Sequence, residues 1–173
     1  MKFDPDILST EDLQIAIRIL DGIYRIDEPD LVIAPDGNPY LYRWHIIRTK
    51  EARVYFHIQV ADDPERPLHD HPWDNFSVIL SGGYREIMCM ENAPPTERNT
   101  YTFHRNKGDV ISRQAAWSHR LFLPPVYPYT MTLFSTGPKV REWGFWYEKG
   151  WVPFTEVTQQ LSDGRSVHIK GGM

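Results

Sequence analysis

Hydrophobic residues near the N-terminus recur at helical spacing, at Leu13, Ile17, Leu20 and Tyr24. Ser9 or Thr10 can cap the start of such a helix with a side-chain oxygen. Acidic residues follow in the first turn, Glu11 and Asp12, where the helix dipole stabilises negative charge. The pattern predicts one helix over about residues 10–21.

After Pro39 the spacing changes to short runs rich in β-branched and aromatic residues, which are typical of strands. Nine runs follow: YLYRWHIIR, RVYFHIQVA, NFSVILS, GYREIMCM, TYTFHR, DVISR, SHRLFL, YTMTLFST and VREWGFWY. Turns that contain Pro or Gly, such as PDGNP, SGG and TGPK, separate many of them. The chain is therefore predicted to be all-β, a barrel or a sandwich, with one N-terminal helix.

The length of 173 residues fits one compact domain better than two. Within it we expect an N-terminal helical extension over residues 1–39, a β-barrel over residues 40–155, and a C-terminal tail over residues 156–173. The tail is expected to be loose from Asp163 onward.

Composition and charge narrow the function classes. The formal charge of −4 and the pI near 6.0 offer no basic surface, so composition does not support binding to nucleic acid or to a membrane surface. Cys89 is the only cysteine, which excludes an internal disulfide, and the first residues lack the apolar core of a secretory signal. No apolar run approaches the ~18 residues that suggest a membrane span. We expect a soluble, cytoplasmic protein.

Candidate metal ligands lie in two segments. His69 and His71 are two residues apart, so in an extended chain both imidazoles point to one face while Asp70 points away. His119 lies near the start of a later strand and can meet the pair across a barrel. Three neutral imidazoles suit iron, zinc, copper, nickel or manganese. We predict that these histidines hold one divalent transition metal.

The first of these segments resembles the first motif of the cupin superfamily, whose fold is a double-stranded β-helix, or jelly-roll barrel. That motif reads Gly, five residues, His-x-His, three or four residues, Glu, six residues, Gly. From His71, three intervening residues lead to Asn75 and six more to Gly82; the four-residue variant leads to Phe76 and Gly83. Neither position is the glutamate of the family.

The second cupin motif reads Gly, five residues, Pro-x-Gly, two residues, His. Gly108 and His119 have that spacing, although Gln114 and Ala116 replace the Pro and the Gly. The resemblance covers roughly residues 40–150 and implies a metal held in the barrel.

The missing glutamate leaves two alternatives for the ligand set. The site has three histidines only, or Asp74 supplies the carboxylate from the turn that follows Pro72. The structural alternative for Asp74 is a turn aspartate that accepts hydrogen bonds from nearby backbone amides.

The HDH string and the later His119 are similar to the thiol dioxygenase branch of cupins, in which three histidines hold ferrous iron. That branch carries a serine, histidine and tyrosine network on the strand after the last ligand. Here the corresponding residues are Thr130, Thr132 and Phe134. Because the phenol is absent, the resemblance is carried over for the metal site and not for a cysteine-type substrate.

Other residues are candidates for the substrate site. Trp73 and Trp117 can wall a pocket, or are core aromatics. Three arginines can anchor a carboxylate or phosphate, or are solvated strand residues: Arg85, Arg113 and Arg141. Glu86 is a general acid or base if it points inward. The remaining histidines are interpreted as packed or surface residues: His45, His57, His104 and His168.

These features favour a mononuclear non-haem metal enzyme of the dioxygenase type that acts on a small molecule, with iron preferred and zinc, nickel or manganese as alternatives. A lyase or isomerase that uses the metal as a Lewis acid is a related hypothesis. The alternative from another class is a non-catalytic cupin that binds or sequesters a small molecule; an accessory cupin acting through its helix is a third. We also expect a homodimer, since the YLYRWHIIR run is a plausible edge strand that needs covering.

Overall fold

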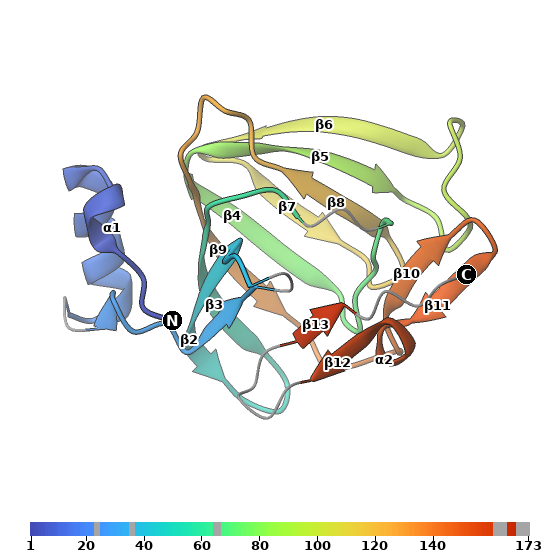
Figure 1. Cartoon of the computed structure of the whole chain (residues 1–173), viewed down its shortest axis with the longest axis horizontal. Helices are drawn as coiled ribbons and strands as arrows, with labels where there is room; N and C mark the ends of the chain where they lie inside the picture. The colour runs from blue at the N-terminus through green and yellow to red at the C-terminus, as the bar shows by residue number, and fades with distance from the viewer. Residues whose placement is uncertain (23–24, 35–36, 64–66, 161–165, 169–173) are drawn as a thin grey trace.

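The structure is a computed structural model that describes residues 1–22, 25–34, 37–63, 67–160 and 166–168 (Figure 1). Tyr24, part of the predicted helical pattern, lies outside the described residues. Among the described helices, none is long and apolar enough to cross a membrane.

Two antiparallel sheets face one another and form the body of the molecule (Figure 1). The larger has the strand order β1 (Leu31–Ile33), β2 (Leu41–Arg48), β3 (Arg53–Gln59), β9 (Thr130–Thr136), β4 (Asn75–Ser81) and β7 (Val110–Arg113). The smaller has the order β6 (Thr100–Asn106), β5 (Gly83–Cys89) and β8 (Ser118–Phe122). Such a double sheet is the jelly-roll type of barrel that the sequence predicted.

The C-terminal part adds two hairpins. The first consists of β10 (Gly144–Tyr147) and β11 (Gly150–Pro153), and after the single-turn helix α2 (Phe154–Val157) the second pairs β12 (Thr158–Gln160) with β13 (Ser166–His168). All nine predicted strand runs therefore contain a strand. The expectation of a loose tail from Asp163 onward is wrong for residues 166–168, because their backbone pairs with β12.

The N-terminal segment forms a short 3-10 helix (Pro5–Ile7) and then the predicted helix, α1 (Thr10–Leu20). Ser9 caps α1, since its Oγ accepts a hydrogen bond from the Asp12 backbone N–H at 3.2 Å. The helix ends at Leu20 and is capped by Asp21, whose φ of 56° is left-handed.

The main hydrophobic core lies between α1 and the outer face of the large sheet. Ala16 and Leu20 of the helix belong to the same buried cluster as Trp44, Phe56 and Met131 of β2, β3 and β9. Trp44 and Phe56 are directly paired across the two strands. Because strand side chains alternate between faces, the neighbours of these residues point into the barrel instead. The barrel interior therefore receives a different set of side chains, with polar ones among them.

A buried hydrogen-bonded clamp fastens α1 to the barrel. The Tyr129 hydroxyl accepts from the Ser9 backbone N–H at 2.9 Å and donates to Asp12 Oδ2 at 2.7 Å. Ser81 Oγ donates to the same carboxylate oxygen at 2.8 Å. The position of the helix therefore depends on specific polar contacts as well as on the apolar core.

The turn between β4 and β5 requires a glycine at Gly82. Its φ is 70°, and a Cβ atom there would clash with the backbone oxygen of Tyr129. No other residue fits without a shift of the backbone at Tyr129, just before β9.

The expected edge strand is partly covered within the chain itself. Residues Leu31–Ile33 pair with Leu41–Arg43, the first part of β2. This three-residue strand was not predicted, since so short a run has no recognisable period.

Candidate metal centre

The three predicted histidines come together at one wall of the barrel interior. His69 and His119 form an antiparallel bridge, with each backbone N–H donating to the other's carbonyl at 3.0 and 2.8 Å. The His71 backbone N–H donates to the Ala115 carbonyl at 3.0 Å. These bonds hold the segment before β4 extended, so His69 and His71 project to the same side. One ring nitrogen from each histidine lies within 4.8 Å of the other two.

Asp70 points away from this cluster, as the alternation of an extended chain predicts. Its buried carboxylate accepts from the Gly144 backbone N–H at 2.7 Å and from Trp151 Nε1 at 2.9 Å, and it forms an ion pair with Arg141 at 3.0 Å. Burial raises the pKa of Asp70, although the Gly144 hydrogen bond and the Arg141 charge oppose that rise. Arg141 thus has an internal partner and is not an anchor in the cavity.

His119 is oriented by a buried carboxylate. Glu86, with 0% exposure, lies with Oε1 at 2.6 Å from His119 Nδ1. A carboxylate only accepts, so Nδ1 carries the hydrogen and Nε2 is left for another partner. Burial raises the pKa of Glu86, but the His119 hydrogen bond and the Arg113 charge outweigh it and hold the pKa below its ordinary range. Glu86 thus points inward, which the sequence left open, and its partner is the candidate ligand His119.

Arg113 closes the buried network behind His119. Its Nε donates to Glu86 Oε1 at 2.7 Å, and its terminal nitrogens donate to Ser77 Oγ at 3.0 Å and to the Tyr84 hydroxyl at 3.2 Å. A longer bond of 3.4 Å reaches Asn75 Oδ1, at the position where the cupin motif has glutamate. The carboxylate beside the candidate ligands is therefore that of Glu86 on β5, and not one at position 75. It contacts His119 but does not belong to the group of candidate ligand atoms.

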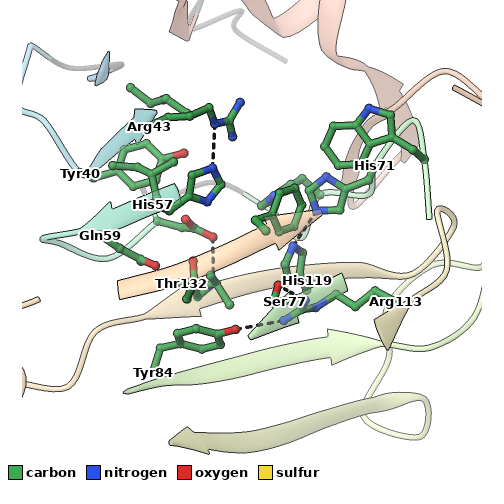
Figure 2. Close-up of a pocket in the computed structure, with 17 residues that line it drawn as sticks. Tyr40, Arg43, His57, Gln59, His71, Ser77, Tyr84, Arg113, His119 and Thr132 are labelled. Carbon is green, nitrogen blue, oxygen red and sulfur yellow. Dashed lines mark hydrogen bonds between the residues drawn. The ribbon is translucent and has the colours of Figure 1, made fainter. Parts of the chain in front are cut away.

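A cavity of about 110 Å³ opens in front of the histidines and is lined by the inner faces of both sheets. Trp73 lines it and stacks on His71, with ring centroids 5.0 Å apart. Figure 2 shows Arg43 with His57 on one side of this space and His71 with His119 on the other. The cavity thus combines a candidate metal centre with a second group of polar side chains.

Two cavity histidines are held neutral. Burial, followed by the charges of His119 and His69, lowers the pKa of His71 well below its ordinary value. Burial and the Arg43 charge do the same for His57. A neutral imidazole is the form that can bind a metal or accept a hydrogen bond.

Three other predicted residues lie apart from the candidate ligands. Asp74 Oδ1 accepts from the Ala115 backbone N–H at 2.7 Å, the structural alternative given for it. Arg85 is exposed and lies over the Phe122 ring, 4.5 Å from its centroid, outside this cavity. Trp117 does not line the cavity either. Of the three predicted substrate-binding residues, Trp73 alone is placed there.

Sequence reasoning missed Arg43 and His57 as cavity residues. They face each other across β2 and β3 in the strand register, so both side chains project from the same face. The alternation of side chains along each strand was the available signal. To use it, one has to know which face of the sheet α1 covers.

No protein-family model matches the chain. No curated protein sequence matches it either. Three of the similar solved structures are hydroxypropylphosphonic acid epoxidase from S. wedmorenis, a cupin superfamily protein from Desulfitobacterium hafniense DCB-2 and oxalate decarboxylase from Bacillus subtilis.

The epoxidase is 14% identical, with 75% of each chain covered and a TM-score of 0.45. The cupin superfamily protein is 10% identical, with 62% of this chain and 84% of that one covered and a TM-score of 0.43. Oxalate decarboxylase is 17% identical, with 73% of this chain and 30% of that one covered and a TM-score of 0.48. Such distant similarities do not transfer an activity, so function has to be argued from the site itself.

Proposed function

We propose that this chain, a β-barrel of the cupin type, holds one divalent transition metal on His69, His71 and His119 and uses it to act on a small molecule. The observation that carries the proposal is the convergence of three ring nitrogens on one cavity wall. A histidine whose other nitrogen donates to a carboxylate is the usual arrangement of a metal ligand, and His119 with Glu86 has it.

The donor set fits a metal of the first transition row. Nitrogens that share a metal at 2.0–2.1 Å lie about 3.0–3.4 Å apart. The Nε2 atoms of His71 and His119 are 2.8 Å apart, and the ring nitrogens of all three histidines lie within 4.8 Å of one another, so the rings would reorient to reach these separations. Three neutral imidazoles suit iron, zinc, nickel or manganese, and we propose ferrous iron as the resident ion.

An iron ion held by these three histidines would have positions left for O₂ and substrate, and would supply the chemistry of a non-haem oxygenase. The side chains around the candidate ligands suit that use. Trp73 covers His71, while Phe134 packs against both rings and lines the cavity. These aromatic groups limit the access of water to the reacting atoms. A dioxygenase-type reaction on a small molecule is therefore the proposed activity.

Metal binding is tested by reconstituting the protein anaerobically with ferrous iron and measuring bound metal after gel filtration. We expect one iron per chain in the wild type and loss of iron in His119→Ala. The matched control is His104→Ala, because His104 is an exposed histidine of β6 that does not line this cavity. Equal iron content in the wild type and His119→Ala would remove the proposal.

The oxygenase assignment has its own test. Nitric oxide binds ferrous iron at positions that O₂ can occupy. The iron-loaded protein should therefore give a ferrous–nitrosyl signal in electron paramagnetic resonance. Retention of zinc in place of iron through native purification, with no nitrosyl signal after iron loading, would contradict the oxygenase and favour the lyase or isomerase that uses a Lewis-acidic metal.

A further inference from the structure

We propose that Arg43 is the anchor for a negatively charged group of the substrate, a carboxylate or a phosphonate, in the cavity that faces the three histidines. The inference deepens the proposed function: only if that function holds is the bound anion a substrate. It assigns a chemical class, a small acid.

The position of Arg43 follows from the strand register. Arg43 of β2 is paired with His57 of β3, and both side chains line the cavity on the inner face of the sheet (Figure 2). The neighbouring Trp44 points the opposite way, into the core under α1. An arginine is thus held at the inner wall by the same alternation that builds the core.

Most of the hydrogen-bonding capacity of Arg43 is unused within the protein. Its Nε–H donates to His57 Nε2 at 2.8 Å, and a guanidinium has four further N–H donors. Among the residues that the structure describes, no acceptor bonds to these terminal groups and no carboxylate forms an ion pair with Arg43. A sheltered cation without a counter-charge is costly, and a bound anion would offset that cost.

The other arginine of the cavity serves as an internal comparison. Arg113 is bonded to Glu86, Ser77 and Tyr84, so each of its three nitrogens already has a partner within the protein. Arg43 has a neutral histidine in place of the carboxylate. The barrel therefore gives Arg113 a carboxylate partner, Glu86, which also pairs with Arg105, whereas the ion pairs among the described residues give Arg43 none.

The guanidinium of Arg43 is also fixed in orientation. The bond to His57 holds one edge, and the Tyr55 ring lies under the guanidinium carbon, 4.6 Å from the ring centroid. His57 is itself stacked on Phe134, with centroids 5.3 Å apart. Such pre-ordering lowers the entropic cost of binding and presents two parallel N–H groups to a planar or tetrahedral oxyanion. The volume of about 110 Å³ suits a small acid.

The inference is tested by calorimetric titration of the iron-loaded and the metal-free protein with acetate and with methylphosphonate, which separate the two anion types. Acetamide is the neutral counterpart of acetate. We expect at least one anion to bind both forms of the wild type, and acetamide to bind neither. Arg43→Met should weaken anion binding about tenfold to a hundredfold, the effect of losing hydrogen bonds to a charged group.

Arg85→Met is the matched control, because Arg85 is exposed on the other sheet and outside this cavity, and it should leave anion affinity unchanged. Arg43→Lys keeps the charge without the planar fork and should bind anions with intermediate affinity. Thermal unfolding shows whether Arg43→Met is folded. If it is not, the anion affinity of Arg43→Lys tests the inference instead.

Several results would overturn the inference: no anion binding by the wild type, acetamide binding as well as acetate, or unchanged affinity in the Arg43 variants. Failure of the proposed function is separate, since it appears as loss of iron binding in the wild type. Anion binding that still depends on Arg43 in that protein would support the anion site alone.

Discussion

Glu86 and His119 are joined by a hydrogen bond of 2.6 Å between Oε1 and Nδ1, on the neighbouring strands β5 and β8. The sequence separates them by 33 residues, and the sheet places them in contact. The bond fixes the imidazole tautomer and directs Nε2 toward the other two candidate ligands. A carboxylate so placed also makes the imidazole a stronger donor to a metal.

Glu86→Gln should therefore weaken metal binding by about 10- to 100-fold, the typical effect of losing a carboxylate behind a ligating histidine. It should also destabilise the protein by about 3–5 kcal/mol, because the buried Arg113 loses its counter-charge. Metal competition assays and denaturant unfolding measure the two effects. Glu97→Gln, at an exposed position, is the control, and equal metal affinity in the two variants would contradict the proposed role.

The stability of the metal-free protein should fall as the pH falls from about 7 to 5. Burial and nearby positive charge lower the pKa of His57 and of His71 well below the ordinary value of about 6.5. In that window the unfolded chain binds protons at these histidines and the folded chain does not. The free energy of unfolding therefore decreases by up to about 1.4 kcal/mol per pH unit for each histidine.

Denaturant unfolding at several pH values measures that slope. His57→Gln should reduce it by about one proton, whereas His104→Gln should leave it unchanged because His104 is exposed. A free energy of unfolding that is constant between pH 7 and 5 would show that the folded protein protonates these histidines as readily as the unfolded chain does.

Tyr129→Phe should loosen the attachment of α1 to the barrel. The substitution removes the acceptor of the Ser9 N–H and one donor to Asp12, at a cost of about 1–3 kcal/mol. Tyr101→Phe, on an exposed side chain, should change stability by less than about 0.5 kcal/mol. Metal affinity should be unaffected by Tyr129→Phe, since the clamp joins α1 to the barrel away from the candidate ligands. A similar effect of both substitutions on thermal unfolding would argue against the clamp.

Gly82→Ala should be more damaging than Gly108→Ala. Both glycines have positive φ, 70° and 93°, so alanine at either position costs about 1–2 kcal/mol in backbone strain. A Cβ at Gly108 meets nothing within 4 Å, whereas one at Gly82 meets the Tyr129 carbonyl. The clash should add about 1–3 kcal/mol. Comparable unfolding midpoints for the two variants would mean that the backbone at Tyr129 shifts at little cost.

The sequence was most informative where local pattern and tertiary structure agree. The run from Arg53 to Gln59 has strand composition and is a central strand, and Ser9 caps α1 as its residue type predicts. Leu31–Ile33 and the short elements after residue 150 were missed, because three or four residues carry no usable period. Their pairing depends on partners supplied by the rest of the fold.

The same distinction holds for the site. The spacing of the sequence identified His69, His71 and His119. In an extended chain the first two lie on one face, and the spacing of the cupin motif indicates the third. Arg43 was not identified, since the alternation of Tyr42, Arg43 and Trp44 along β2 does not tell which face lies inside, and the packing of Trp44 under α1 decides it. Glu86 was recognised as a candidate, but its contact with His119 is a property of the sheet and not of either segment.

Asp70 links the segment of the first two candidate ligands to the C-terminal β10–β11 hairpin. It stands between two candidate ligands and bonds to Gly144 and Trp151, at the base and on the second strand of the β10–β11 hairpin. A shift of the His69–His71 segment must either carry that hairpin with it or break a buried ion pair with Arg141. The β10–β11 hairpin and the arrangement of the candidate ligands are therefore mechanically coupled, so a displacement of one is transmitted to the other.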